Sequence, residues 1–369
     1  MTRVPFVLAR FPDPQLTKLK IVERLERFWV KYHAATIGYE YKANLAEDGR
    51  IDFEDWERRS KELEIPEDIK QRIRRRAAIL AERNTTGTPL SDVPEKDVRR
   101  LEPVKNGVDL IRIPSEHRAD EIAAAVHAEF PWFGPVTEWA WHCMRRSVRT
   151  GEKGFCLPPL LLNGPAGIGK SSWARLISEQ LGLPSVALDA TTESAGFGVV
   201  GLQAGWGSSR TGRPVNVILQ RKVGNPLVVI DEIDKVSTAH SEKGTAHSLT
   251  DSLLPLLEPA TARGWDDPYF RVPLDMSWIS WVLTSNYLAM IPEPLKSRCQ
   301  IFELRPLTGV ELADFVCRDG KRRGLPRDMI QAIAEAFRCS RSRQLAPSLR
   351  TAVRMLNAAE RALDHPVLH

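Results

Sequence analysis

The chain has 369 residues, of which 43% are hydrophobic and 27% charged, which is enough to build two or three globular domains. The formal net charge of +5 permits contact with nucleic acid without requiring it. No apolar run approaches the roughly 20 residues of a membrane-spanning helix, and the start of the chain is too short for a signal-peptide core, so we expect a cytoplasmic protein. The five cysteines form no CxxC pair, which argues against a disulfide framework and a zinc knuckle.

The N-terminal part of the chain predicts helices. Between Pro14 and Tyr41, apolar residues recur every three or four positions, the period of an amphipathic helix. A second helix is expected from about Pro66 through residue 84, because proline suits the first helical turn. Residues 84–94 contain a glycine and two prolines and predict a linker. We assign residues 1–104 to a helical N-terminal adaptor or assembly region with its linker.

From about Lys105 to Pro306, short apolar strands alternate with helical stretches. This alternation predicts a mostly parallel sheet covered by helices on both faces, with a ligand edge at the carboxyl ends of the strands. After Pro306 the strands stop. Thr308 and Glu311 have the spacing of a capping box, so residues 306–369 are expected to form a small helical domain.

A glycine-rich loop, NGPAGIGKSS, follows the apolar run LPPLLL and precedes a helical stretch. It satisfies the pattern GxxxxGK[ST], in which backbone N–H groups and the positive end of the helix bind phosphate. Lys170 would reach the β- and γ-phosphates, and Ser171 would ligate Mg²⁺. The predicted cofactors are therefore ATP and Mg²⁺. The loop residues expected to bind them are Gly164, Pro165, Ala166, Gly167, Ile168, Gly169, Lys170, Ser171 and Ser172.

A second motif, which is acidic, distinguishes an ATP hydrolase from a small-molecule kinase. In LVVIDEIDK, Asp231 and Glu232 follow a buried strand and emerge at its carboxyl end. Asp231 would hold Mg²⁺, usually through water, and Glu232 would polarise the attacking water as a general base. The two acids together indicate an ATPase.

These stretches together resemble an AAA+ ATPase, and among those the ATPase module of Lon proteases. The resemblance covers roughly residues 115–365 and includes GWGSSRTGRPVNVI, SLLPLLEP, WDDPYFRVPLDMSWISWVLTSN and IPEPLKSRCQIFELRPLTGVEL. It implies an α/β fold, the AAA+ P-loop αβα sandwich with a parallel sheet. The nucleotide-binding domain would span residues 105–305, preceded by the helical N-terminal region and followed by a helical lid domain.

The resemblance implies further catalytic residues beside Lys170 and Glu232. In VLTSN, Asn286 has the position of the sensor-1 asparagine, which would orient the attacking water. In PLKSRCQIFEL, Arg298 has the position of the arginine finger, which completes the active site of a neighbouring subunit by neutralising charge on the γ-phosphate.

The resemblance also extends to residues that touch the nucleotide. In PSLRTAVRML, Arg350 resembles the sensor-2 arginine that contacts the γ-phosphate from the same subunit, and Arg354, one turn later, is the alternative. The segment PWFGPVTEW resembles the lining of the adenine pocket, which implies a role for Phe133 and Gly134.

An arginine finger implies a homo-oligomer, in this family a closed ring that most often has six subunits. In GWGSSRTG, Trp206 aligns with the aromatic residue of the loop that grips substrate polypeptides, although Gly207 replaces the aliphatic residue that follows in the family. The resemblance thus implies a protein substrate or partner, held in a central pore.

We expect a Lon-like ATPase that is not itself a protease, because the chain stops at His369 just beyond the lid and contains no GxSxG motif. The predicted function is an ATP-hydrolysing ring that remodels, unfolds or threads a protein partner. One alternative is a nucleic-acid-associated ATPase, either a loader or a mobile-element regulator. It is supported by a basic cluster made of Arg72, Arg74, Arg75 and Arg76. The other alternative is an ATP-dependent assembly switch that acts by binding. No membrane partner is expected.

Overall fold

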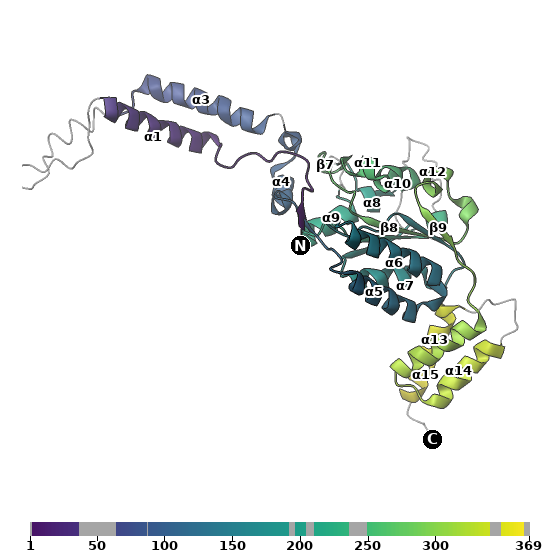
Figure 1. Cartoon of the computed structure of the whole chain (residues 1–369). Coiled ribbons are helices and arrows are strands. Elements are labelled where there is room, and N and C mark those ends of the chain that lie inside the picture. The colour runs from purple at the N-terminus through teal and green to yellow at the C-terminus, as the bar shows by residue number, and fades with distance from the viewer. Residues whose placement is uncertain are drawn as a thin grey trace, which may run out of the picture. The chain divides into compact units, whose positions relative to one another are not determined.

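The computed structural model describes residues 2–36, 64–86, 88–191, 196–203, 210–235, 249–339 and 348–364 (Figure 1). The chain forms two compact units. One contains Ala9–Val98, and the other contains Met1–Leu8 together with Arg99–His369. Within the described part of the chain, no helix is both long and apolar enough to cross a membrane.

The smaller unit is a pair of long helices that pack against each other, α1 (Lys18–Thr36) and α3 (Glu67–Thr85) (Figure 1). Ile21, Ile73 and Ala77 are buried in this unit. The buried Asn84 side chain also exchanges two hydrogen bonds of 3.0 Å with the backbone of Asp13, which ties the end of α3 to the segment before α1. The sequence predicts both helices, the first from its apolar period and the second from Pro66 at its start.

The segment predicted as a linker has local structure. It contains a short 3-10 helix, η1 (Pro89–Asp92), whose first turn is capped by the Thr88 hydroxyl, which accepts a hydrogen bond from the N–H of Leu90. Leu90 and Val93 are buried. Helix α4 (Glu95–Leu101) and the 3-10 helix η2 (Glu102–Val104) follow.

The first residues of the chain belong to the larger unit. Strand β1 (Thr2–Val4) pairs antiparallel with β2 (Val108–Leu110). The backbone at position 107 passes so close to Val4 that only glycine fits there. Its φ is +95°, and a Cβ would lie 2.3 Å from the Val4 carbonyl oxygen. The boundary predicted at residue 104 therefore does not coincide with the division between the two units.

The centre of the larger unit is a five-stranded parallel sheet with the strand order β4-β5-β8-β3-β9. This architecture confirms the predicted α/β fold. β8 is buried along its whole length, as expected for a strand covered on both faces. The strands are β3 (Leu160–Asn163), β4 (Ser185–Asp189), β5 (Leu227–Asp231), β8 (Ser280–Ser285) and β9 (Gln300–Glu303).

Helices cover both faces of this sheet (Figure 1). One layer is made of α5 (Glu116–Glu129), α6 (Gly134–Arg149) and α7 (Lys170–Leu181), with the 3-10 helix η3 (Pro131–Phe133) between α5 and α6. The other layer contains α8 (Phe197–Val200), α10 (Leu249–Leu257), α11 (Pro259–Ala262) and α12 (Glu293–Lys296). The remaining short elements are α9 (Arg213–Arg221), η5 (Ile233–Lys235), β6 (Trp265–Asp266), β7 (Pro273–Leu274) and η6 (Leu288–Met290).

Three helices follow the sheet, α13 (Gly309–Arg322), α14 (Arg327–Cys339) and α15 (Leu349–Asp364). The first has the predicted capping box, because Thr308 and Glu311 each accept a hydrogen bond from the backbone N–H of the other. The Arg305 guanidinium, bonded to Glu311, lowers the pKa of that carboxyl to about 2. A continuous apolar core joins these helices to α5 and α7, and Arg318 donates a 2.7 Å hydrogen bond to the Glu129 carbonyl.

Candidate active site

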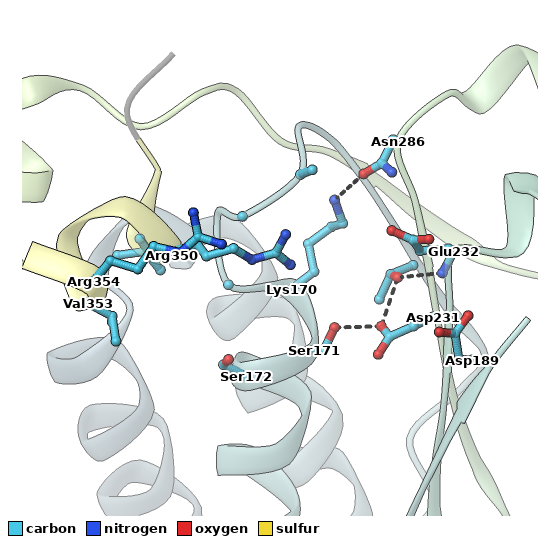
Figure 2. Close-up of a pocket in the computed structure, with 15 residues that line it drawn as sticks. Lys170, Ser171, Ser172, Asp189, Asp231, Glu232, Asn286, Arg350, Val353 and Arg354 are labelled. Carbon is cyan, nitrogen blue, oxygen red and sulfur yellow. Dashed lines mark hydrogen bonds between the residues drawn. The ribbon is translucent and has the colours of Figure 1, made fainter. Parts of the chain in front are cut away.

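The parallel sheet brings three chain segments to one edge. The glycine-rich loop follows β3, the acidic pair lies at the end of β5, and Asn286 follows β8. Since β3 and β5 pair in parallel with β8 on either side of it, the carboxyl ends of all three strands lie at the same edge of the sheet. A cavity of about 540 Å³ opens there (Figure 2). Its lining residues are Ala166, Gly167, Gly169, Lys170, Ser171, Ser172, Asp189, Asp231, Glu232, Thr284, Asn286, Leu349, Arg350, Val353 and Arg354.

The glycine-rich loop has a backbone that only glycine allows without strain. Gly167 and Gly169 have φ values of +77° and +102°. A Cβ on Gly167 would lie 2.9 Å from the Ser348 Cβ, and one on Gly169 would lie 3.0 Å from the Phe130 ring. The loop therefore passes close to its neighbours and leads into the N-terminus of α7, where backbone N–H groups favour a phosphate chain.

Lys170 lines the cavity, and three hydrogen bonds hold its ammonium group. Its ammonium donates hydrogen bonds to the carbonyls of Gly164 at 2.5 Å and Pro165 at 3.0 Å, and to the Asn286 Oδ1 at 3.0 Å (Figure 2). The residue is only 8% exposed. Burial lowers the pKa of Lys170 to about 8, although the nearby carboxylates oppose the shift. An arriving phosphate anion would replace lost hydration and favour the charged ammonium.

Ser171 and Asp231 form the predicted metal-binding pair. The Ser171 hydroxyl donates a 2.5 Å hydrogen bond to the Asp231 Oδ1, and the Thr284 hydroxyl donates to the same oxygen at 2.9 Å (Figure 2). Hydroxyl and carboxylate oxygens are the ligands that Mg²⁺ prefers, so this pair fits the ion. The described residues contain no cluster of three or more His, Cys, Asp or Glu side chains that could hold a metal. Phosphate oxygens and water would therefore supply the other ligands.

Glu232 lies at a strained turn directly after β5. Its φ is +58°, a value that costs a non-glycine residue about 1 kcal/mol or more. The Glu232 N–H donates to the Thr284 hydroxyl at 3.2 Å, which helps to hold the turn, and the carboxylate pairs with the Lys235 ammonium at 2.7 Å. Figure 2 shows Glu232 on the same side of the cavity as Asn286. The turn thus presents the Glu232 carboxylate to the cavity beside Asn286.

Asp234 is a site residue that the sequence analysis missed. It is 8% exposed, and its Oδ2 accepts hydrogen bonds from the backbone N–H groups of Asn286 and Tyr287, each at 3.2 Å. Its Oδ1 is buried and has no hydrogen-bond partner among the described residues. Asp234 does not line the cavity. Its contacts fix the backbone from which the Asn286 side chain projects, so we expect it to act as a positioning residue.

We expect Asp234→Ala to lower kcat by about 10- to 100-fold, because a displaced Asn286 would no longer orient water. The KM for ATP should change less than about threefold, since the phosphate loop is untouched. Steady-state ATPase kinetics would measure both. Asp234→Asn keeps one oxygen acceptor for the two N–H groups and should recover most of the lost turnover. A loss of kcat equal in the two variants would contradict the positioning role.

The helical lid reaches the phosphate loop directly. The N–H of Leu349 donates a 2.9 Å hydrogen bond to the Gly167 carbonyl at the start of α15. Arg350 and Arg354 both line the cavity, entering from α15 on the side opposite Asp231 (Figure 2). The structure therefore places both candidate sensor-2 arginines at the site.

The two residues implied for the adenine pocket do not line this cavity. Phe133 is fully buried and stacks on Trp173 with 6.1 Å between ring centroids, so its ring belongs to the core beneath α7. Neither Phe133 nor Gly134 lines the cavity. The adjacent aromatic residues are the ones that contact the loop. The Trp132 indole N–H donates to the Ile168 carbonyl at 3.0 Å, and the Phe130 ring packs over Gly169.

Two further predicted residues are outside the cavity. Arg298 follows α12, donates a 2.8 Å hydrogen bond from Nη1 to the Pro294 carbonyl and does not line the cavity. Its Nε is buried without a hydrogen-bond partner in the part of the chain that the structure describes. Trp206 lies outside the described residues. Gly164, Pro165 and Ile168 belong to the loop without lining the cavity.

Comparison with known proteins gives one consistent family. Residues 160–307 match the ATPase family associated with various cellular activities, AAA. The chain is 32% identical over 165 residues to the Lon protease of Mycoplasma mycoides, a match that covers 45% of this chain and 20% of that protein. It is 36% identical over 149 residues to the mitochondrial Lon protease homolog of Candida dubliniensis, covering 40% and 13%. With the Lon protease of Koribacter versatilis it shares 28% identity over 197 residues, covering 52% and 24%. The match therefore spans about a quarter or less of each relative.

Proposed function

Because residues 160–307 form a domain of the AAA family of ATPases, we propose that this chain hydrolyses ATP in a ring and uses the energy to remodel, unfold or thread a protein partner. The observation that carries the proposal is the single cavity that gathers the phosphate loop, the acidic pair, Asn286 and two lid arginines. The Lon proteases among the relatives support a polypeptide as the partner.

In the proposed reaction, the loop N–H groups and the Lys170 ammonium bind the phosphate chain. Glu232 accepts a proton from the attacking water, and the Asn286 amide orients that water. Mg²⁺ held by Ser171 and, through water, by Asp231 would neutralise charge on the β- and γ-phosphates. Lys170 donates a 3.0 Å hydrogen bond to the Asn286 Oδ1, so the residue proposed to bind phosphate and the residue proposed to orient water are in direct contact.

The lid provides the means of turning nucleotide state into movement. Leu349 bonds to the phosphate loop, and Arg350 and Arg354 project toward the same cavity. Contacts between these arginines and the γ-phosphate would exist only before hydrolysis. Their loss would change the free energy of the lid position, which is how a bound ligand shifts a conformational equilibrium.

A ring of subunits is supported by the position of Arg298. The residue belongs to the same domain as the cavity but does not line it. An arginine finger acts on the nucleotide of the next subunit, so its own cavity does not need it. We propose a homo-oligomeric ring, with six subunits as the family's usual number, located in the cytoplasm.

Coupling to a protein partner is tested at Trp206. We expect Trp206→Ala to abolish ATP-dependent remodelling or unfolding of a captured partner while ATP turnover stays within about twofold of the wild type, because Trp206 has no proposed part in the phosphate chemistry. Trp206→Phe should preserve a bulky ring and most of the activity. The measurement compares phosphate release with partner unfolding in the same reactions. Full remodelling by Trp206→Ala would remove this residue from the substrate path.

The nucleic-acid alternative has one supporting observation. The arginines of the basic cluster are all exposed on α3, and only Arg74 forms an ion pair that the structure describes, at 3.6 Å from Glu67. Binding of DNA or RNA that weakens steeply with salt and disappears when these arginines are neutralised would favour this function. The assembly switch is the third candidate, and it predicts that biological activity survives when hydrolysis is blocked.

A further inference from the structure

The smaller unit exposes two large aromatic rings on its first helix. Phe28 and Tyr32 lie one turn apart on α1 and are 66% and 65% exposed. Leu25, which is half-buried, lies one turn before Phe28 on the same side of the helix. These three residues therefore have the spacing i, i+3 and i+7, at which one helix contacts another across an apolar seam.

The two exposed rings are ordered by their contact with each other. Their centroids are 6.2 Å apart, and their planes differ by 17°. Stacking fixes the orientation of both rings before any partner arrives, which lowers the entropy that binding would cost. It also turns one face of each ring toward the other ring, so that face is closed to a nucleotide base.

A basic stripe runs along α1 beside the rings. Lys20, Arg24, Arg27 and Lys31 follow one another at spacings of four, three and four residues, which places them along one side of the helix. All four side chains are exposed. Of the four, only Arg27 has an ion pair that the structure describes, at 3.5 Å from Glu23. The other three leave positive charge on this side of the helix.

Helix α3 carries a similar combination of charge and apolar surface. Arg72, Arg76 and Arg83 are exposed and share one side of the helix with Ile79, which is also exposed. In total, α1 has five basic and two acidic residues, and α3 has six basic and three acidic residues. A second copy of this unit would therefore meet like charge, whereas an acidic partner would meet opposite charge.

We propose that the face of α1 formed by Leu25, Phe28 and Tyr32, with Arg24 and Lys31 beside it, docks an acidic amphipathic helix of a protein partner. The apolar residues would contact the apolar side of that helix, and the basic residues would pair with its carboxylates. The docking face shares no residue with the ATP cavity, so docking does not depend on hydrolysis. In a remodelling ring, it would supply the recognition of the partner.

Two other ligand classes match these observations less well. A nucleic acid backbone needs cations along one side of a helix, but the basic cluster at positions 72 to 76 is distributed around α3. A helix that lies in a membrane surface buries a broad apolar face. One side of α1 already packs against α3, which leaves a narrow apolar stripe.

The test is a fluorescence anisotropy titration of the full chain, without nucleotide, into a labelled peptide. The peptide is a helix of about 18 residues with leucine along one face and glutamate on both flanks. We expect binding that weakens as the salt concentration rises. Phe28→Ser with Tyr32→Ser should lower the affinity at least about tenfold, because aromatic anchors carry much of the binding energy. Arg24→Glu with Lys31→Glu should lower it by a similar factor.

Leu19→Ser is the matched control for the loss of apolar surface. Leu19 is 77% exposed and lies nine positions before Phe28, on the opposite side of α1, so its loss should leave the affinity unchanged. Arg24→Lys with Lys31→Arg keeps both charges and should retain most of the affinity. A peptide with lysine in place of glutamate should bind at least about tenfold more weakly. Circular dichroism would check the fold, and the charge variants remain informative should the ring variant unfold.

Absence of peptide binding, or binding that is indifferent to both double variants, would overturn the proposal. So would a preference of the wild-type chain for a short single-stranded oligonucleotide or for phosphatidylserine vesicles over the peptide. Residues 47–57 of this chain contain six acidic residues, with Ile51, Phe53 and Trp56 among them. Binding that begins only when those six acids are changed to their amides would assign the docking face to the chain itself and not to a partner. Because the titration uses no ATP, its failure would leave the proposed hydrolysis untouched.

Discussion

Glu232→Gln is expected to lower ATP turnover at least about 100-fold, the contribution typical of a general base. Glutamine has nearly the same volume and keeps the backbone turn, but its amide cannot accept the proton of the attacking water. ATP binding should survive, because the loop, Lys170 and Ser171 are unchanged. Phosphate release under saturating ATP would measure the first effect, and equilibrium binding of labelled ATP the second.

The ion pair between Glu232 and Lys235 requires a control. Glu232→Gln also removes this pair, so the loss of turnover could reflect a displaced turn. Lys235→Ala removes the pair but keeps the carboxylate, and the two side chains are 36% and 48% exposed, so the pair contributes little stability. We expect Lys235→Ala to retain turnover within about fivefold. Glu232 would lose its assigned role if the glutamine variant hydrolysed ATP as fast as Lys235→Ala.

The Glu232→Gln variant also distinguishes the protein-remodelling ring from the assembly switch. An ATP-filled ring that cannot hydrolyse should hold its partner and fail to remodel it. Co-purification with the Glu232→Gln protein, followed by identification of what is held, would name that partner. A protein that remains fully active in this state would instead be an assembly switch.

Local sequence patterns predicted the parts of the site that depend on local geometry. A glycine-rich loop between a strand and a helix, and two acids at the end of an apolar strand, each need only their own neighbours to form. The topology then brings them together, because parallel strands end at a common edge. Lys170, Ser171, Asp231 and Glu232 accordingly line one cavity.

Residues that act through distant contacts could not be found in this way. Asp234 bonds to the backbone of Asn286 at a sequence separation of 52 residues, and Thr284 bonds to the Glu232 N–H at the same separation. Both contacts depend on β5 lying beside β8, which no short pattern shows. A third acid two positions after Glu232 was the available signal for Asp234.

Phe133 shows that one local sequence pattern can fit two different environments. An aromatic residue beside glycine fits both an adenine pocket and a packed core, and the structure buries the Phe133 ring against Trp173. Strand β1 is a second example of a feature that depends on tertiary contacts. Thr2 pairs with Leu110, which is far away in the sequence, and this pairing joins the start of the chain to the larger unit. In both cases tertiary packing determined what local preference left open.

Arg298→Ala is expected to lower turnover about 1000-fold in the assembled protein, within the range measured for arginine fingers. The guanidinium that neutralises developing charge on the γ-phosphate would be missing at every subunit boundary. Affinity for ATP should change little, since Arg298 does not line the cavity of its own chain. Arg327→Ala, which removes an exposed arginine at the start of α14, is the matched control and should leave turnover unchanged.

Mixing two inactive proteins decides whether Arg298 acts on a neighbour. In a ring assembled from Arg298→Ala and Glu232→Gln subunits, some boundaries combine the intact Glu232 of one chain with the intact Arg298 of the next. Turnover of the mixture should therefore exceed that of either variant alone and should depend on the mixing ratio. An arginine that acts within its own chain cannot restore any site by mixing. An inactive mixture in which joint assembly has been demonstrated would thus contradict catalysis between subunits, even if each single variant loses activity as expected.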